Sequence, residues 1–571
     1  MCKGDFSVFF SEIEKIGRCV YRRYQIWISN KLFLRYNREK FIYALFFDKT
    51  IISRWKSQTE IGIVKSKYCA GFFEAYFYKL VEEGHIEEII RVTNLYAFEA
   101  KITNKQTNKA LLSVMPIGNA RESLLVLLND NWEDIKQKVN KPCVIRLCED
   151  YAKQKNRSEI ASIAACKIIE NYIEEVENAR EDGWYYQTDK TMMPLLQIVY
   201  MMADASEEWI GRFFVKLQTY CDSDDAKEQR FAYELIEETL KNTYPILAKS
   251  LPKNLCDLAN RLWINCTEKE YGFGGYYEYD LRGGHAYGLS KYADHYRMSH
   301  NGVYENIFLW NILTEKFEIG FEWAINFVNQ TIANYVDSKP DYICQVPVYF
   351  ADDKSTKEYF GSPELWLAGI QEHSIPTIIG DVVYVLKTIL INSVRNNVKD
   401  EEYIKVFATY VRREIYKKAN NIALLSIIAA IGFNFQKELP GYALDLASSF
   451  EIIYWDMHRY GLYVKNPAKE LLEQQILCAV GIPSLIERYK RDERCNNSLQ
   501  QYVMNMQLIA DEEVISKCNK ICDYMYSRVK NNVEEADLYL QIQKMDLRNA
   551  SLLKVAENTY AVEPQITGEA K

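Results

Sequence analysis

Apolar residues recur at steps of three and four along most of this 571-residue chain, which is the spacing that buries one face of an α-helix. The clearest stretches are residues 158–178, 315–336 and 379–394. The segments between such stretches are short and carry Gly, Pro, Asn and Asp, which favour turns. No fixed period of about 30 to 50 residues stands out, as it would in a regular repeat protein. The pattern therefore predicts an all-α fold, an α-solenoid or stacked helical hairpins made of degenerate repeats.

Two local signals near the middle of the chain add detail to this pattern. Residues Tyr342 to Phe350 alternate between apolar and polar, but Pro347 has no N–H to donate, so we expect an edge strand or an extended loop there. A helix is predicted to begin shortly afterwards, because Ser362 can cap it, Pro363 fits its first position and Glu364 suits the positive end of its dipole.

The distribution of the helical stretches divides the chain into three parts and a tail. An N-terminal helical array covers residues 1–265, and a central region of loops and long helices covers residues 266–395. A C-terminal helical array follows over residues 396–555. The last segment, 556–571, lacks an apolar stripe and is predicted to be a disordered tail.

The central region contains the one segment that generic helix packing does not explain. The 34 residues from Tyr271 to Tyr304 are rich in glycine and histidine and hold eight tyrosines. Tyrosine is enriched at interface hot spots, so the predicted binding residues are Tyr276, Tyr277, Tyr279 and His285. The alternative is a packing loop whose rings contact neighbouring helices and whose hydroxyls bond water.

Histidines of the same segment give a second hypothesis, a metal site. His285, His295 and His300 are spaced by ten and then five residues, with aspartates nearby. Imidazole and carboxylate are ligands that zinc prefers, but the short His-x-x-x-His or Cys-x-x-Cys spacing of a strong site is missing. The competing interpretation is a set of polar loop residues that bond backbone groups.

A carbohydrate or small-molecule enzyme is the alternative to a binding protein. Glu278 and Asp280 lie among aromatic residues and glycines, as paired carboxylates do in sugar-binding grooves, and His285 follows them. A helical toroid with this loop at its mouth would be the matching fold. Against an enzyme, the chain has no Gly-x-Ser-x-Gly and no Gly-x-x-x-x-Gly-Lys-Ser/Thr motif. We therefore expect a non-enzymatic protein without a cofactor and keep the enzyme as the alternative.

Composition limits the binding partners and the cellular compartment that can be expected for this chain. Hydrophobic residues make up 48% and charged residues 26% of the chain, which are globular values, and the net charge of −8 argues against nucleic acid as a partner. The 14 cysteines are dispersed, which predicts reduced thiols. The longest apolar run, Ile422 to Phe433, is shorter than the roughly 20 residues that span a bilayer. With no signal peptide visible, we expect a cytoplasmic protein without a membrane partner.

Four stretches of the central region occur in an order that resembles a known family. Residues 296–313 carry a Tyr…aromatic-Leu helix pattern, and residues 317–331 carry Glu-x-Gly followed by apolar positions and Asn. An aromatic-Gly-x-Pro turn follows within 359–366, and a long apolar helix over 381–390. Together these stretches resemble the helical C-terminal region of bacterial antiviral STAND NTPases. The matching positions are structural, so the resemblance transfers no catalytic residue.

A sensor is what the resemblance implies: a TPR- or HEAT-like array that recognises a viral (phage) protein and releases a coupled ATPase and effector. The ATPase and effector parts that precede this region in the family are absent from this chain. The chain is then either a detached or truncated sensor part of such a protein or a stand-alone relative that kept the scaffold. The expected partners are a protein ligand of viral origin and a separately encoded ATPase or effector.

Overall fold

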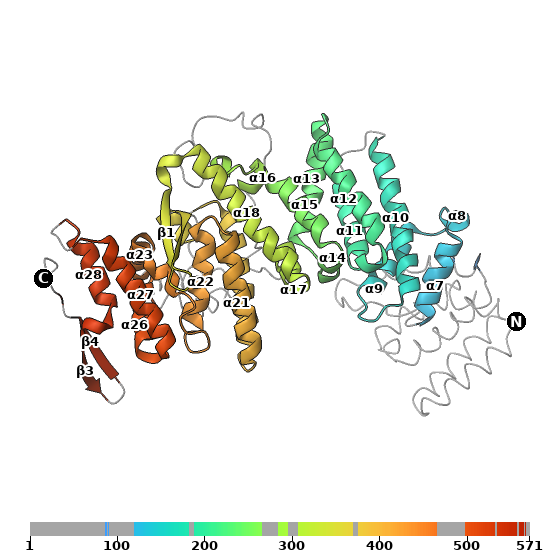
Figure 1. Cartoon of the computed structure of the whole chain (residues 1–571). Coiled ribbons are helices and arrows are strands. Elements are labelled where there is room, and N and C mark those ends of the chain that lie inside the picture. The colour runs from blue at the N-terminus through green and yellow to red at the C-terminus, as the bar shows by residue number, and fades with distance from the viewer. Residues whose placement is uncertain are drawn as a thin grey trace, which may run out of the picture. The chain divides into compact units, whose positions relative to one another are not determined.

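The computed structural model describes residues 86–87, 90, 119–181, 188–264, 284–294, 307–368, 375–464, 497–530, 534–556, 559–564 and 566. These residues are predominantly helical, which confirms the predicted all-α class (Figure 1). The chain forms two compact units, Met1–Phe213 and Phe214–Lys571, whose boundary falls within helix α12 (Glu207–Cys221). The divisions expected after residues 265 and 395 do not coincide with this boundary, because no break in the apolar pattern marks it.

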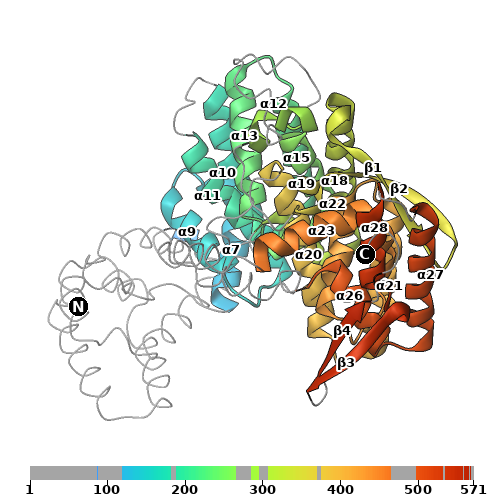
Figure 2. The same cartoon turned by 90° about the vertical axis from the view of Figure 1, so that its left-hand side faces the viewer.

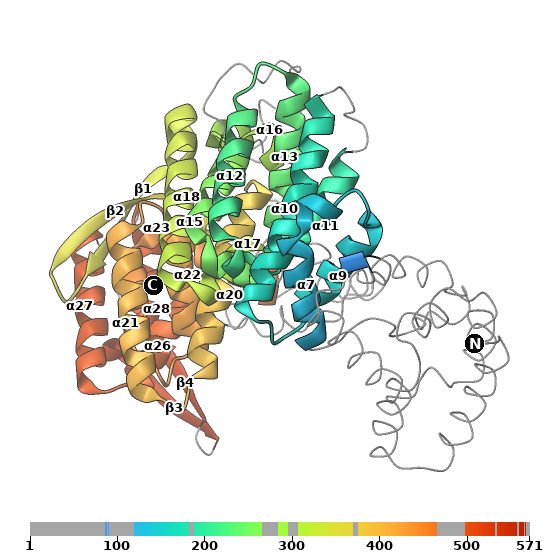
Figure 3. The ribbon, with the colours of Figure 1, turned by 90° about the vertical axis from the view of Figure 1, so that its right-hand side faces the viewer.

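The described part of the first unit is built around one long helix, α10 (Glu159–Glu181), which confirms the helix predicted over residues 158–178. The elements that pack around it are α7 (Asn119–Asp130), α9 (Lys141–Ala152), α11 (Thr188–Tyr200) and the 3-10 turn η2 (Ala203–Ala205). A short helix, α8 (Trp132–Ile135), follows α7 (Figure 1). Figure 3 shows α7, α9 and α11 beside α10. The apolar side of α10 supplies Ile168, Ile169 and Ile173 to the core, and all three are fully buried.

An aromatic core holds the first helices of the second unit together. These elements are α13 (Ala226–Lys241), α14 (Pro245–Ser250), α15 (Pro252–Trp263), η4 (Gly284–Tyr287), α16 (Lys291–Asp294), α17 (Phe308–Glu315) and α18 (Phe317–Ser338). The buried Trp263 ring contacts Phe308, Trp323 and Phe327 at centroid distances of 5.3, 6.1 and 6.0 Å. Because such rings remove much apolar area from water, the cluster fixes α15 and α17 against α18, the helix predicted over residues 315–336.

Helix α22 (Ile422–Asn434) is the buried centre of the next group of elements. This group comprises η5 (Pro340–Tyr342), β1 (Cys344–Phe350), β2 (Ser355–Gly361), α19 (Pro363–Trp366), α20 (Thr377–Asn396), α21 (Glu401–Lys418), α22, η6 (Leu444–Ser448) and α23 (Phe450–Val464). Every residue from Ile422 to Phe433 is buried, so the longest apolar run is a core helix. Among the described residues one helix, α20, is long and apolar enough to cross a membrane, and 61% of its most apolar window is buried inside the protein.

The predicted edge strand pairs with a second strand. β1 and β2 form an antiparallel hairpin in which Val346 lies opposite Tyr359, and both of these side chains are buried. The predicted helix start after this hairpin is confirmed, because the hydroxyl of Ser362 accepts a hydrogen bond from the N–H of Leu365 at the beginning of α19. The hairpin and α19 together carry the chain from α18 to α20.

The C-terminal helices lead into a second hairpin. These elements are α26 (Leu499–Ile509), α27 (Glu512–Arg528), α28 (Ala536–Met545), η8 (Leu547–Asn549), β3 (Ala550–Ala556) and β4 (Thr559–Pro564). β3 and β4 pair antiparallel, and the hairpin projects from the helices beside it (Figure 2). Strand β4 lies in the segment 556–571 that was predicted as a disordered tail. For β4 that prediction is wrong, because the loss of a helical stripe does not exclude a strand whose backbone groups bond across a hairpin.

Candidate functional site

Most of the predicted site residues lie outside the described part of the chain. They are the binding candidates Tyr276, Tyr277 and Tyr279, the carboxylates Glu278 and Asp280, and the metal candidates His295 and His300. The tyrosine-rich binding loop and the enzyme with paired carboxylates therefore both stay predictions.

His285 is the predicted site residue that the structure describes. It is exposed in the turn η4, close to the buried Tyr287, whose ring stacks on Tyr335 of α18 at 4.3 Å. The side-chain amide of Asn334 donates to the carbonyl oxygen of Tyr287 at 3.3 Å. Gly288 closes the turn with a φ of 67°, a conformation that suits glycine. The turn is thus fixed on α18 and leaves the imidazole of His285 at the surface.

Groups that could hold a metal or act as a nucleophile are scarce in the described ranges. No group of three His, Cys, Asp or Glu side chains is arranged there to hold a metal ion. The described cysteines are buried apart from Cys344. Burial raises the pKa of Cys221 to about 11 and the pKa of Cys256 to about 12, so these thiols are protonated near neutral pH and are poor nucleophiles.

The first unit contains an open cleft of about 290 Å³, formed by α10 and by the segment that runs from the end of α7 into α8. Its lining comprises five carboxylates, three amides, one indole and one ammonium group, from Asn129, Asp130, Asn131, Trp132, Glu133, Asp134, Lys167, Glu170, Asn171 and Glu174. Burial raises the pKa of Glu170, and a hydrogen bond from the hydroxyl of Ser206 opposes this rise. The cleft is acidic and polar, but an acidic lining alone does not identify a ligand.

An aromatic surface lies on helices α18 and α21 of the second unit. Successive ring centroids are 5.7, 5.4, 5.2 and 6.3 Å apart in the order Tyr403, Phe407, Phe317, Phe321 and Tyr410. We call these five residues the aromatic ladder. The exposed fraction is 1% for Phe321 and 42% for Tyr403, so the ladder runs from the core to the surface.

Other exposed side chains of α21 extend the ladder. Val406 lies three residues from Tyr403 and four from Tyr410, which places all three on one side of the helix, and it is 66% exposed. The guanidinium of Arg413 lies 5.7 Å from the ring centroid of Tyr410. Aromatic rings with an arginine and an exposed aliphatic side chain are typical of protein interfaces.

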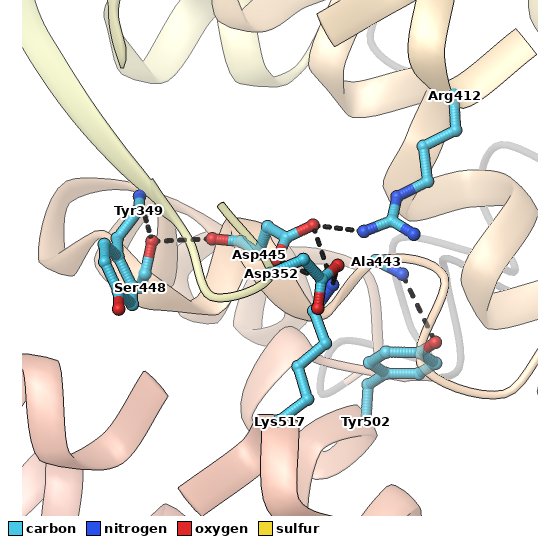
Figure 4. Close-up of polar contacts among 8 residues, drawn as sticks. All are labelled: Tyr349, Asp352, Arg412, Ala443, Asp445, Ser448, Tyr502 and Lys517. Carbon is cyan, nitrogen blue, oxygen red and sulfur yellow. Dashed lines mark hydrogen bonds and ion pairs between the residues drawn. The ribbon is translucent and has the colours of Figure 1, made fainter. Parts of the chain in front are cut away.

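A charged site lies next to the β1–β2 hairpin, where four side chains from distant parts of the chain meet (Figure 4). Asp445 of η6 is 1% exposed and pairs with the guanidinium of Arg412 from α21. The ammonium of Lys517 from α27 lies 3.0 Å from Asp445 Oδ1 as an ion pair and donates a hydrogen bond to Oδ2 at 3.4 Å. The same ammonium donates to Asp352 in the hairpin turn at 2.6 Å. We call these four residues the charge cluster.

Uncharged groups hold the backbone beside the charge cluster (Figure 4). The hydroxyl of Ser448 donates to the carbonyl oxygen of Asp445 at 2.6 Å and accepts from the N–H of Tyr349 in β1 at 2.7 Å. The hydroxyl of Tyr502 accepts from the N–H of Ala443 at 3.4 Å. These bonds tie η6 to the hairpin on one side and to α26 on the other, so the position of Asp445 is fixed.

Sequence reasoning missed the charge cluster for a physical reason. Asp445 is 33 residues from Arg412 and 72 from Lys517, and Lys517 is 165 residues from Asp352. Sequence periodicity reports neighbours three or four residues apart, so it contains no signal for such contacts. The only local hint is the turn sequence Ala-Asp-Asp-Lys, which places carboxylates at a hairpin tip.

Comparison with known proteins leaves the family open. No family model and no curated protein matches the chain. The assignment of a function therefore depends on the residues themselves, and the aromatic ladder and the charge cluster are the two surfaces that carry it.

Proposed function

We propose that this chain is a non-enzymatic helical scaffold that recognises a protein ligand through the aromatic ladder. The observation that carries the proposal is the exposed end of the ladder, where Tyr403 is 42% and Val406 is 66% exposed. A few aromatic and arginine side chains supply most of the binding free energy of a typical interface. The ladder offers such anchors, with Arg413 beside them at the ring of Tyr410.

The ladder is held in place before any ligand binds. Phe317 and Phe321 of α18 contact the rings of Phe407 and Tyr410, which are themselves on α21. The C-terminal end of α21 is fixed as well, because the ammonium of Lys357 donates to the last carbonyl oxygens of the helix and its cap, at 2.8, 3.1 and 2.9 Å. Side chains that are already ordered lose little conformational entropy on binding, which favours affinity.

The resemblance to STAND NTPases supplies the ligand class in this proposal. It implies a viral (phage) protein as the ligand and a separately encoded ATPase or effector as the second partner. Two of the stretches that carry the resemblance, 317–331 and 381–390, lie in α18 and α20. Helix α18 also carries the inner rings of the ladder, and this shared location supports a sensor function in phage defence.

Direct binding to purified phage proteins tests the proposal. The chain would be immobilised and exposed to individual phage proteins, and affinity would be measured by biolayer interferometry. For a protein that binds, we expect the double substitution Tyr403→Ala and Val406→Ser to weaken the affinity at least tenfold, or about 1.4 kcal/mol, because it removes two exposed anchors.

Two further variants separate the ladder from other surfaces. Tyr454→Ala removes a tyrosine that is 71% exposed on α23, outside the ladder, and should leave the affinity unchanged. The triple substitution of Tyr276, Tyr277 and Tyr279 by Ala tests the tyrosine-rich loop instead. If the triple variant loses binding and the ladder variant keeps it, recognition belongs to the loop and the proposed role of the ladder is wrong.

A further inference from the structure

Three of the four residues in the charge cluster are largely shielded from water, and together they carry a net positive charge. The side chains of Lys517 and Arg412 are 11% and 25% exposed, and Asp445 is 1% exposed. These three groups together carry one excess positive charge. The carboxylate that balances it belongs to Asp352, whose side chain is 65% exposed in the hairpin turn. Three members of the cluster are therefore shielded from water, and the fourth reaches the cluster from the surface.

Three buried polar atoms of this neighbourhood make no hydrogen bond to the described residues. Two are donors, the Nε–H of Arg412 and the hydroxyl of Tyr416, and the third is the acceptor Asp445 Oδ1, which has the ion pair with Lys517 at 3.0 Å. The guanidinium of Arg412 lies 5.6 Å from the ring centroid of Tyr416, so the two groups belong to one polar neighbourhood. Buried donors without an acceptor are uncommon in folded proteins, and they mark places where an oxygen from water or from a ligand is accommodated.

We propose that the charge cluster binds a carboxylate of the protein ligand and that Asp352 occupies this position in the absence of the ligand. The inference rests on the proposed function, since it assigns an acidic side chain to the recognised protein. Asp352 is the exchangeable member because exposed ion pairs contribute little to stability, and the ammonium of Lys517 keeps its ion pair with Asp445 when the Asp352 side chain moves into water. Asp445 cannot exchange, because leaving Arg412 and Lys517 without it would strand two shielded charges.

A carboxylate suits the cluster better than an uncharged group does. The planar guanidinium and the neighbouring ammonium both form short, charge-assisted hydrogen bonds with carboxylate oxygens. Lys517 already holds such a bond to Asp352 at 2.6 Å, so the geometry accepts this chemistry. An incoming Asp or Glu side chain would replace one carboxylate by another and preserve the charge balance.

Removal of Asp352 should turn the cluster into a measurable anion site. The experiment follows the melting temperature of the full chain in sodium glutarate and in sodium chloride at equal ionic strength. Asp352→Asn should melt about 1–2 °C higher in saturating glutarate than in chloride, with a saturable dependence on concentration. The wild type should respond less, because Asp352 competes for the site.

Control variants of the neighbouring residues test whether the glutarate response comes from the charge cluster. Asp353→Asn removes the neighbouring exposed carboxylate of the same turn and should behave as the wild type. Asp352→Asn combined with Lys517→Gln should lose the glutarate response, while Asp352→Asn with Lys517→Arg keeps a cation in place and should retain it. If glutarate raises the melting temperatures of Asp352→Asn and Asp353→Asn equally, or raises neither, the proposed carboxylate site is wrong. A response to phosphate without one to glutarate would overturn the carboxylate assignment.

This experiment is independent of the phage-protein measurement. A glutarate response of Asp352→Asn without any bound phage protein supports the anion site and rejects only the ligand class. Binding of a phage protein that is unchanged in Lys517→Gln and in Asp352→Asn supports the scaffold and rejects the assigned contact.

Discussion

Two aspartates of the second unit, Asp445 and Asp456, are equally buried at 1% exposure but differ in the groups around them. Asp456 of α23 pairs with Arg459, which is also 1% exposed, at 2.8 Å. Its carboxylate accepts from the indole N–H of Trp366 at 3.0 Å and from the backbone N–H of Leu499 at 2.6 Å. The second bond places a negative charge at the N-terminus of α26, where the helix dipole favours it. Each of these four residues is at most 1% exposed.

Asp445 is surrounded by groups that reach the surface. Its partner Arg412 is 25% exposed, and Lys517 links it to Asp352, which is mostly in solvent. The comparison shows that burial of a carboxylate does not by itself indicate function. The closed pair of Asp456 and Arg459 fixes the packing of helices, whereas the charge cluster remains in contact with solvent through Asp352.

Removal of the closed pair should have the largest effect on stability. Asp456→Ala leaves the guanidinium of Arg459 buried without its carboxylate, and we expect a loss of about 3–5 kcal/mol in the free energy of unfolding. Urea unfolding followed by circular dichroism measures this loss. Tyr454→Ala on the same helix should change stability by less than about 0.5 kcal/mol, because that side chain is in solvent. Similar losses in the two variants would show that Asp456 has no special role.

Neutralisation of Asp445 in the charge cluster should have a smaller effect on stability. Asp445→Asn removes the shared negative charge, but the amide oxygen still offers an acceptor to Arg412 and Lys517 still pairs with Asp352, so we expect a loss of about 1–3 kcal/mol. The same urea experiment measures it. A loss as large as that of Asp456→Ala would mean that the charge cluster is closed to solvent, and the distinction between the two aspartates would fail.

The apolar pattern predicted those parts of the fold that depend on local spacing. The helix predicted over residues 379–394 is confirmed as α20, and α19 begins after Ser362 as the Ser-Pro-Glu sequence predicted. The buried run of α22 was also visible, although its central place was not, because a helix that is apolar on all sides does not show which neighbours cover it.

The candidate surfaces could be predicted only in part. Tyr403, Val406 and Tyr410 share a helix face that spacing reveals, but their contact with Phe317 and Phe321 joins α21 to α18 across the fold. The charge cluster needs the hairpin turn, α21, η6 and α27 together, and no local sequence pattern encodes contacts among these four elements. The sequence drew attention to the tyrosine-rich loop rather than to the ladder or the charge cluster, because local composition can be read from a sequence and tertiary contacts cannot.

The smallest predicted effect concerns the pH dependence of the Asp352 contact. Partial burial would raise the pKa of this carboxyl group, but the hydrogen bond and the charge of Lys517 outweigh it and lower the pKa. A lowered pKa means that the folded state favours the charged form, so the contact stabilises the fold above the unfolded pKa of about 3.9 and is lost as the pH falls below it. Because the group is largely exposed, Asp352→Asn should be less stable than the wild type by only about 0.2–1 kcal/mol near neutral pH. That difference should vanish at a pH low enough to protonate the carboxyl group in the folded state as well as in the unfolded state. A difference that stays constant down to that pH would show that Asp352 contributes through packing of the turn rather than through its charge, and the exchange of carboxylates at Lys517 would lose its basis.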